Sequence, residues 1–131
     1  MNTGYFYEVS ARFGTEFWVN NPSLPEIEMA LAGGAAGVAS NPNYIVTLLK
    51  AEPEFVHATI DELLASAGAV VDEEKLAMQV IQQAVSRALG IFHTLYEKTD
   101  GRYGQVAIQG SPRNNDNLSA MLDEAETFHE L

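Results

Sequence analysis

Apolar residues along this chain fall into two kinds of pattern, short continuous runs and longer stretches with helical spacing. The short runs predict three β-strands, near residues 16–20, 36–40 and 105–109. The run from Ala36 to Ala39 shows no polar alternation, which is typical of a parallel strand covered on both faces.

The longer stretches predict helices between and after these strands. Their apolar residues recur at three- and four-residue intervals. The expected helices begin near Leu24, Asn43, Pro53, Asp72 and Leu118. Asn43 and Asp72 are N-cap candidates, Gly68 is expected to end the helix that begins at Pro53, and Gly90 is the point where the long helix after Asp72 could break. Residues 1–15 are aromatic and read as an irregular arm.

Strands that alternate with helices indicate an α/β architecture. The second and third strands are separated by about two and a half helices, more than a minimal crossover needs, which predicts a helical insertion between them. No repeat, low-complexity tract or linker divides the sequence, so we expect residues 1–131 to form a single domain.

Length and charge limit the possible functions. The 131 residues suffice for one core, whereas a complete (β/α)8 barrel needs about 200 residues or more. A net charge of -11 would repel nucleic acid and anionic membranes. Cysteine is absent, which excludes thiolate chemistry and disulfides. Because the sequence shows neither a secretion signal nor a membrane-length apolar run, we expect a cytoplasmic protein.

The stretch from Ala32 to Tyr44 holds the most informative sequence. Glycines Gly33 and Gly34 can end the preceding helix, a short apolar run follows, and Ser40-Asn41-Pro42 lies at the expected carboxyl end of the second strand. This end of a strand is where α/β barrels and open α/β sheets place their chemistry. The alternative is that Asn41-Pro42 is only a turn that closes a strand-to-helix loop.

Three segments together resemble the transaldolase family. Gly37-Val38-Ala39-Ser40-Asn41-Pro42 is similar to its second-strand signature G-V-T-T-N-P, with Ala39 and Ser40 at the threonine positions. Residues 17–31 resemble its first strand and helix, and residues 104–109 resemble its third strand. The likeness covers about residues 17–50 and 101–127. It implies a partial TIM (β/α)8 barrel, namely the first three parallel strands with a helical insertion between strands 2 and 3.

The resemblance also implies roles for residues at the strand ends. Asn20 stands where the family typically has a proton-transferring aspartate, Asn41 matches an asparagine that binds substrate hydroxyls, and Gln109 matches a residue near the catalytic water. Ser40 is grouped with Asn41 as substrate-binding. Carboxamides suit the hydroxyls and carbonyl of a sugar but cannot titrate, so Asn20 puts acid-base chemistry in doubt. The alternative is that these amides cap strand ends and satisfy one another.

The essential family lysine, which forms a Schiff base with the ketose, belongs to a fourth strand beyond this sequence. Lys50, Lys75 and Lys98 are expected to be solvated and unreactive. Histidines are isolated and lack metal-ligand spacing, so we expect no metal, and the family needs no cofactor. Arg113 could meet a phosphate beside a helix N-terminus, although a solvated loop arginine is the simpler interpretation.

Our first hypothesis is a transaldolase-like protein of pentose phosphate metabolism that transfers a dihydroxyacetone unit between sugar phosphates, with this chain alone inactive. A second hypothesis is a non-catalytic, truncated barrel that binds a sugar or a partner protein. A third is a (β/α)8 lyase or isomerase of another family. An unpaired strand edge after residue 109 also predicts self-association.

Overall fold

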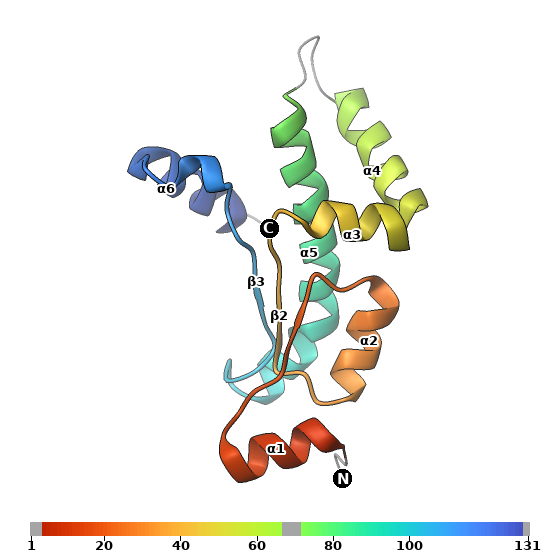
Figure 1. Cartoon of the computed structure of the whole chain (residues 1–131), viewed down its shortest axis with the longest axis vertical. Coiled ribbons are helices and arrows are strands. Elements are labelled where there is room, and N and C mark those ends of the chain that lie inside the picture. Colours follow the sequence, from red (N-terminus) through yellow and green to blue (C-terminus); the bar gives the residue numbers. More distant parts are fainter. Residues whose placement is uncertain (1–3, 67–71, 130–131) are drawn as a thin grey trace.

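The computed structural model describes residues 4–66 and 72–129. Within them the chain forms, in order, α1 (Tyr5–Phe13), β1 (Trp18–Asn20), α2 (Leu24–Ala32), β2 (Gly37–Ala39), α3 (Tyr44–Ala51), α4 (Pro53–Ser66), α5 (Glu73–Lys98), β3 (Gln105–Ala107), the 3-10 helix η1 (Pro112–Asn114) and α6 (Leu118–His129) (Figure 1).

The three strands form one parallel sheet in the order β1-β2-β3. In its register Val19 pairs with Val38, and Val38 with Val106. The three predicted strands, their direction and the α/β class are therefore confirmed. Three parallel strands accompanied by helices are compatible with part of a (β/α)8 barrel.

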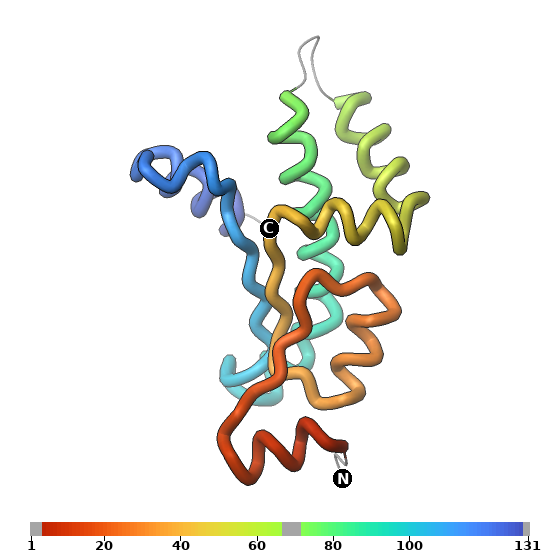
Figure 2. Tube along the Cα trace, viewed as in Figure 1, coloured from red at the N-terminus to blue at the C-terminus, as the bar shows by residue number. Residues whose placement is uncertain are grey.

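One face of the sheet packs against helices. The aligned valines contact a buried cluster in which Ile27 and Ala30 come from α2 and Ala88 and Phe92 from α5, and both helices lie beside the strands in Figure 2. Because side chains alternate along a strand, the residues between the valines occupy the opposite face. Asn20 and Ala107, on that opposite face, are exposed, so we call it the open face.

A second cluster joins the three helices between β2 and β3. Its buried members are Tyr44 and Leu48 from α3, Val56 from α4, and Val80, Ile81, Ala84 and Val85 from α5. The predicted helices from Pro53 and Asp72 are confirmed, and the Asp72 carboxylate caps α5 by accepting from the N–H groups of Glu74 and Lys75. Gly68, expected to end α4, lies outside the described residues.

Two sequence-based expectations about the extent of helices were wrong. The long helix does not break at Gly90, which is exposed within a continuous 26-residue α5. The N-terminal arm is not irregular, because Tyr5–Phe13 form α1. Phe6 stacks on Phe17 with 4.0 Å between ring centroids, and this contact ties α1 to the residue just before β1.

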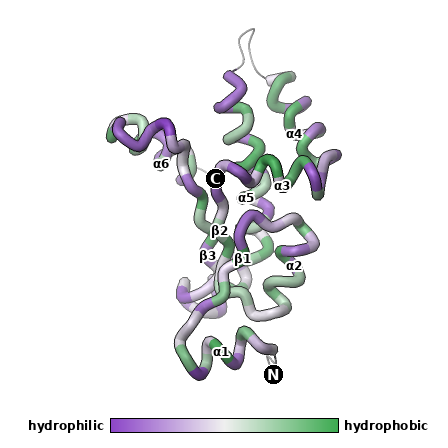
Figure 3. Tube along the Cα trace, viewed as in Figure 1, coloured by the Kyte–Doolittle hydropathy of each residue, from purple (hydrophilic) through white to green (hydrophobic). Residues whose placement is uncertain are grey.

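The last helix is packed differently from the others. None of the α6 residues is buried, and Leu118, Met121 and Leu122 are among the exposed large apolar residues. Figure 1 shows α6 to one side of the sheet, after a loop that is hydrophilic in Figure 3. No helix formed by residues 4–66 or 72–129 has the length and apolar character needed to cross a membrane.

Candidate functional site

The predicted site residues all follow or end strands at the carboxyl edge of the sheet. Backbone hydrogen bonds continue past the strands there. The N–H of Asn21 donates to the Ala39 carbonyl at 2.9 Å, that of Ser40 to Ala107 at 2.9 Å, and that of Gln109 to Ser40 at 3.2 Å. Because the strands are parallel, this edge brings together residues that are far apart in the sequence.

Asn20 and Gln109 are both exposed at this edge. Asn20 is the last residue of β1 and lies in register with Ala39. Within the described part of the chain, no hydrogen bond joins the side chains of Asn20, Asn41 and Gln109 to one another. The structure thus puts the three carboxamides at one end of the sheet without hydrogen bonds among their side chains.

Ser40 is buried, with 6% of its surface exposed. Its hydroxyl donates to the Ala107 carbonyl at 3.1 Å and so ties the end of β2 to β3. A hydroxyl oxygen that donates one hydrogen bond can still accept others.

Asn41 pairs with Asn21, a residue that the sequence analysis did not single out. The Asn21 Nδ2 donates to Asn41 Oδ1, and the Asn41 backbone N–H donates to Asn21 Oδ1, both at 3.0 Å. Asn41 Oδ1 also accepts from the N–H of Asn43 at 3.0 Å. Asn43 occupies the N-cap position of α3, as expected, but its side chain makes no cap bond, so the expected side-chain cap was wrong. The Asn41 side chain instead accepts from the N–H of Asn43 itself.

Tyr44 stabilises the turn that contains Asn21 through a hydrogen bond to the next residue, Pro22. Its hydroxyl donates to the Pro22 carbonyl at 2.5 Å, and the ring is 1% exposed. Burial, with smaller opposing and reinforcing effects of nearby charges, raises the pKa of Tyr44 to about 12. Tyr44 therefore stays neutral and keeps its proton to donate.

Two carboxylates accept hydrogen bonds from residues at the start of α2, beside this turn. Glu26 accepts from the hydroxyl and the backbone N–H of Ser23 at 2.7 and 2.8 Å, and these hydrogen bonds hold its pKa below the ordinary value. Glu52 accepts from the Leu24 N–H and from Arg87, each at 2.8 Å. These contacts link the β1–α2 turn to α3 and α5.

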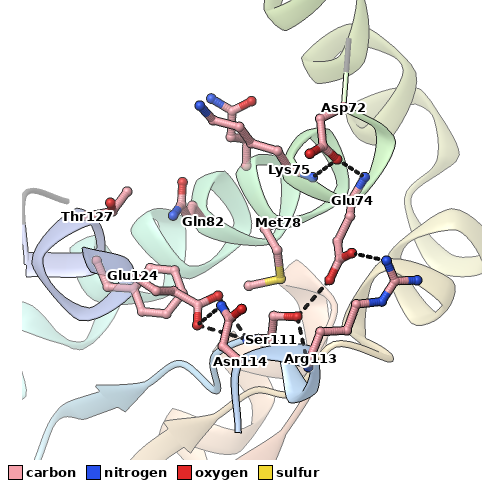
Figure 4. A pocket seen from close by; sticks show the side chains of 12 residues that line it. Asp72, Glu74, Lys75, Met78, Gln82, Ser111, Arg113, Asn114, Glu124 and Thr127 are labelled. Atoms are coloured by element: carbon pink, nitrogen blue, oxygen red, sulfur yellow. Dashed lines mark hydrogen bonds and ion pairs between the residues drawn. The ribbon is translucent and has the colours of Figure 1, made fainter. Parts of the chain in front are cut away.

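A separate cleft of about 370 Å³ lies between η1, the start of α5 and α6 (Figure 4). Glu74 accepts from the Ser111 hydroxyl and pairs with Arg113, each at 2.6 Å. Glu124 accepts from the Ser111 N–H at 2.9 and 3.0 Å. Both carboxylates are thus already engaged by the loop after β3. Arg113 is largely exposed, as expected of a solvated loop arginine, and it pairs with Glu74.

The lysines and histidines belong to helices and not to the strands. Lys50, Lys75 and Lys98 are exposed on helices, as are the three histidines. Across residues 4–66 and 72–129, no three His, Asp or Glu side chains gather closely enough to hold a metal ion.

No protein-family model matches the chain. The chain is 24% identical over 127 residues to the transaldolase of Thiobacillus denitrificans (strain ATCC 25259 / T1). The matched region covers 92% of this chain and 34% of that protein, so the chain spans about a third of the length of this curated relative. The similarity indicates a distant, transaldolase-like relationship.

Proposed function

We propose that this chain forms the first three strand-helix units of a transaldolase-like (β/α)8 barrel, with a helical insertion between β2 and β3. The complete protein would transfer a dihydroxyacetone unit between sugar phosphates in the cytoplasm. The supporting observation is the parallel order β1-β2-β3 with Asn20, Ser40, Asn41 and Gln109 at its carboxyl edge. The distant similarity to a transaldolase agrees with it.

The proposal gives each residue a role within the limits of its chemistry. Asn41 and Ser40 would contact substrate hydroxyls, and Gln109 would hold a water molecule. Asn20, a carboxamide where an acid is typical, would orient this water or the substrate rather than carry a proton. A lysine on a further strand would attack the ketose carbonyl, and loss of water would give the Schiff base.

This function is tested by trapping the Schiff base. The chain is incubated with fructose 6-phosphate, borohydride is added to reduce any imine, and the protein is weighed by mass spectrometry. We expect no mass gain with this chain, because its three lysines are exposed on helices, and a stoichiometric gain with a longer chain that adds a lysine-bearing strand. A gain with residues 1–131 that is lost on replacing Lys50, Lys75 or Lys98 would contradict the proposal.

The second candidate is a non-catalytic module that binds through its surface. The observation that favours it is the free side of β3, which pairs with β2 alone among the described strands, together with the exposed apolar residues of α6. Self-association of the chain would follow from either feature. Sedimentation over a range of concentrations tests this, with Leu122→Ser as the variant expected to weaken association and Asn115→Ser, in the polar loop, as its control.

A further inference from the structure

Backbone N–H groups determine which side-chain amide atom of Asn21 and of Asn41 is the oxygen and which is the nitrogen. A backbone N–H can only donate, so the Asn41 N–H requires the oxygen of Asn21, not its nitrogen, at 3.0 Å. In the same way the Asn43 N–H requires the oxygen of Asn41. The remaining contact, Asn21 Nδ2 to Asn41 Oδ1 at 3.0 Å, is then a correct donor-acceptor pair.

This arrangement leaves the Asn41 nitrogen free. Asn41 Oδ1 already accepts two hydrogen bonds, whereas no residue in the described ranges accepts from its Nδ2. Among the described residues, the buried side-chain nitrogen and oxygen atoms without a hydrogen-bond partner are Nε and Nη2 of Arg87. The Asn41 Nδ2 has no partner and is not one of them, so it is not buried. Since Asn41 is half-buried at the carboxyl edge of the sheet, its Nδ2 hydrogens are accessible from solvent.

We propose that Asn21 is a positioning residue that fixes Asn41 as a hydrogen-bond donor, so that the site takes an acceptor oxygen of its ligand. This inference rests on the proposed function and limits the part of the ligand that Asn41 contacts to a hydrogen-bond acceptor. The ligand group would be a ketose carbonyl or hydroxyl oxygen, or a phosphate oxygen, and not a group that can only donate.

The backbone around Asn21 supports a dedicated role. Asn21 has a φ of 49°, in the left-handed region that asparagine adopts more readily than most residues, and only 8% of its surface is exposed. Its own N–H donates to Ala39, and the carbonyl of the next residue, Pro22, accepts from buried Tyr44. Asn21 is therefore held on both sides, which keeps its amide in one place relative to Asn41.

The experiment is nuclear magnetic resonance of the side-chain amides in the isotopically labelled chain. Without ligand, we expect a through-hydrogen-bond coupling between Asn21 Nδ2 and the Asn41 side-chain carbonyl. Dihydroxyacetone and inorganic phosphate are then added separately. A shift of the Asn41 Nδ2 hydrogens with dihydroxyacetone identifies a sugar oxygen as the ligand group, and a shift with phosphate alone identifies a phosphate oxygen.

Two substitutions at Asn21 test positioning. Asn21→Asp keeps an acceptor for the Asn41 N–H but opposes Asn41 Oδ1 with a second oxygen, and Asn21→Gly suits the left-handed backbone while it removes the amide. In both we expect the Asn41 amide signals to move in the free chain and the affinity for the responding probe to fall about tenfold, the effect of one hydrogen bond. Asn115→Asp, the same chemical change in an exposed loop, should alter neither.

The outcomes separate this inference from the proposed function. If the coupling is present but neither probe moves the Asn41 signals, the sugar site and its acceptor preference are wrong, while the positioning of Asn41 by Asn21 is supported. If the coupling is missing, or if folded Asn21→Asp and Asn21→Gly chains leave the Asn41 signals unchanged, the positioning role itself is overturned.

Discussion

The first and the last strand-helix units of this chain use their helices differently. In the β1–α2 unit the helix returns to the sheet, buries Ile27 and Ala30, and contacts α5. In the β3–α6 unit the helix buries no residue and its main contacts are with η1 (Figure 1). Both helices are amphipathic, so amphipathicity alone does not decide whether a helix of this chain is buried.

The comparison shows that local sequence signals such as a side-chain cap can form a helix without burying it. The start of α6 has a side-chain cap, because Asn117 Oδ1 accepts from the Ala120 N–H at 3.1 Å, and Glu124 fastens the helix to Ser111. These contacts form a helix but give it no core. Most helical stability in proteins comes from packing of an apolar face, and of these two helices only α2 has buried residues.

The largest contrast is expected between one apolar side chain from each helix. Ile27→Ala in α2 removes a residue with no exposed surface and should lower the free energy of unfolding by about 2 to 5 kcal/mol. Leu122→Ala in α6, where the side chain is 55% exposed, should change it by less than about 0.5 kcal/mol. Urea unfolding followed by circular dichroism measures both. Equal losses would mean that α6 is packed in solution.

The chain should also lose stability at alkaline pH because of Tyr44, the α3 residue whose hydroxyl donates to Pro22 in the β1–α2 turn. Its pKa is about 12 in the folded chain and about 10 when unfolded. Its contribution is therefore complete below pH 10 and is lost as the pH rises toward 12, by about 2 to 3 kcal/mol. Unfolding measured at several pH values in this window tests it. Tyr44→Phe, which cannot ionise, should show a shallower decline.

Two glycines compare a crowded position with an open one. A Cβ at Gly37 in β2 would meet the Gln105 carbonyl oxygen at 2.6 Å and the Trp18 ring at 2.8 Å, so Gly37→Ala should destabilise the chain by about 1 to 3 kcal/mol. At Gly90 in α5 a Cβ meets nothing within 4 Å, and Gly90→Ala should stabilise the chain by about 0.5 to 1 kcal/mol. Thermal unfolding shows the two signs, and a stable Gly37→Ala chain would mean that β1 and β3 can separate from β2.

The smallest effect is expected at the cap of α6. Asn117→Ala removes the acceptor for the Ala120 N–H and should leave the global free energy of unfolding within about 0.5 kcal/mol, because none of the α6 residues is buried. Hydrogen exchange should nevertheless become faster in the first turn of α6 alone. Faster exchange that spreads to α2 would show that the two units are coupled.

Much of the fold was predictable from local patterns. Continuous apolar runs predicted the three strands, and the Asp72 cap and helical spacing predicted α5. Residues 5–13 were missed as a helix because Gly4 provides no side-chain cap and the segment is rich in aromatic residues of modest helix propensity. The continuity of α5 at Gly90 follows from packing on either side of it, by Ala88 and Phe92, which overcomes the low propensity of a single glycine.

The candidate site was predictable only in outline. Strand ends and resemblance indicated Asn20, Ser40, Asn41 and Gln109, and all four lie at one edge of the sheet. The contact between Asn21 and Asn41 joins residues twenty positions apart and depends on a left-handed turn. The one local signal was an asparagine before Pro22 at a strand end, and nothing in the pattern distinguished its role from that of the neighbouring Asn20.

The Trp18 ring packs closely against Gly37, on the open face of the sheet, so its fluorescence can report on whether that face is covered. Trp18 is the one tryptophan in the sequence, it is half-buried, and its ring lies 2.8 Å from the point where a Cβ of Gly37 would be. A strand, ligand or second chain that covers this face would exclude water from the indole and move its fluorescence emission to shorter wavelengths. Changes confined to α6 would leave the emission where it is, so a simple spectrum distinguishes the two regions.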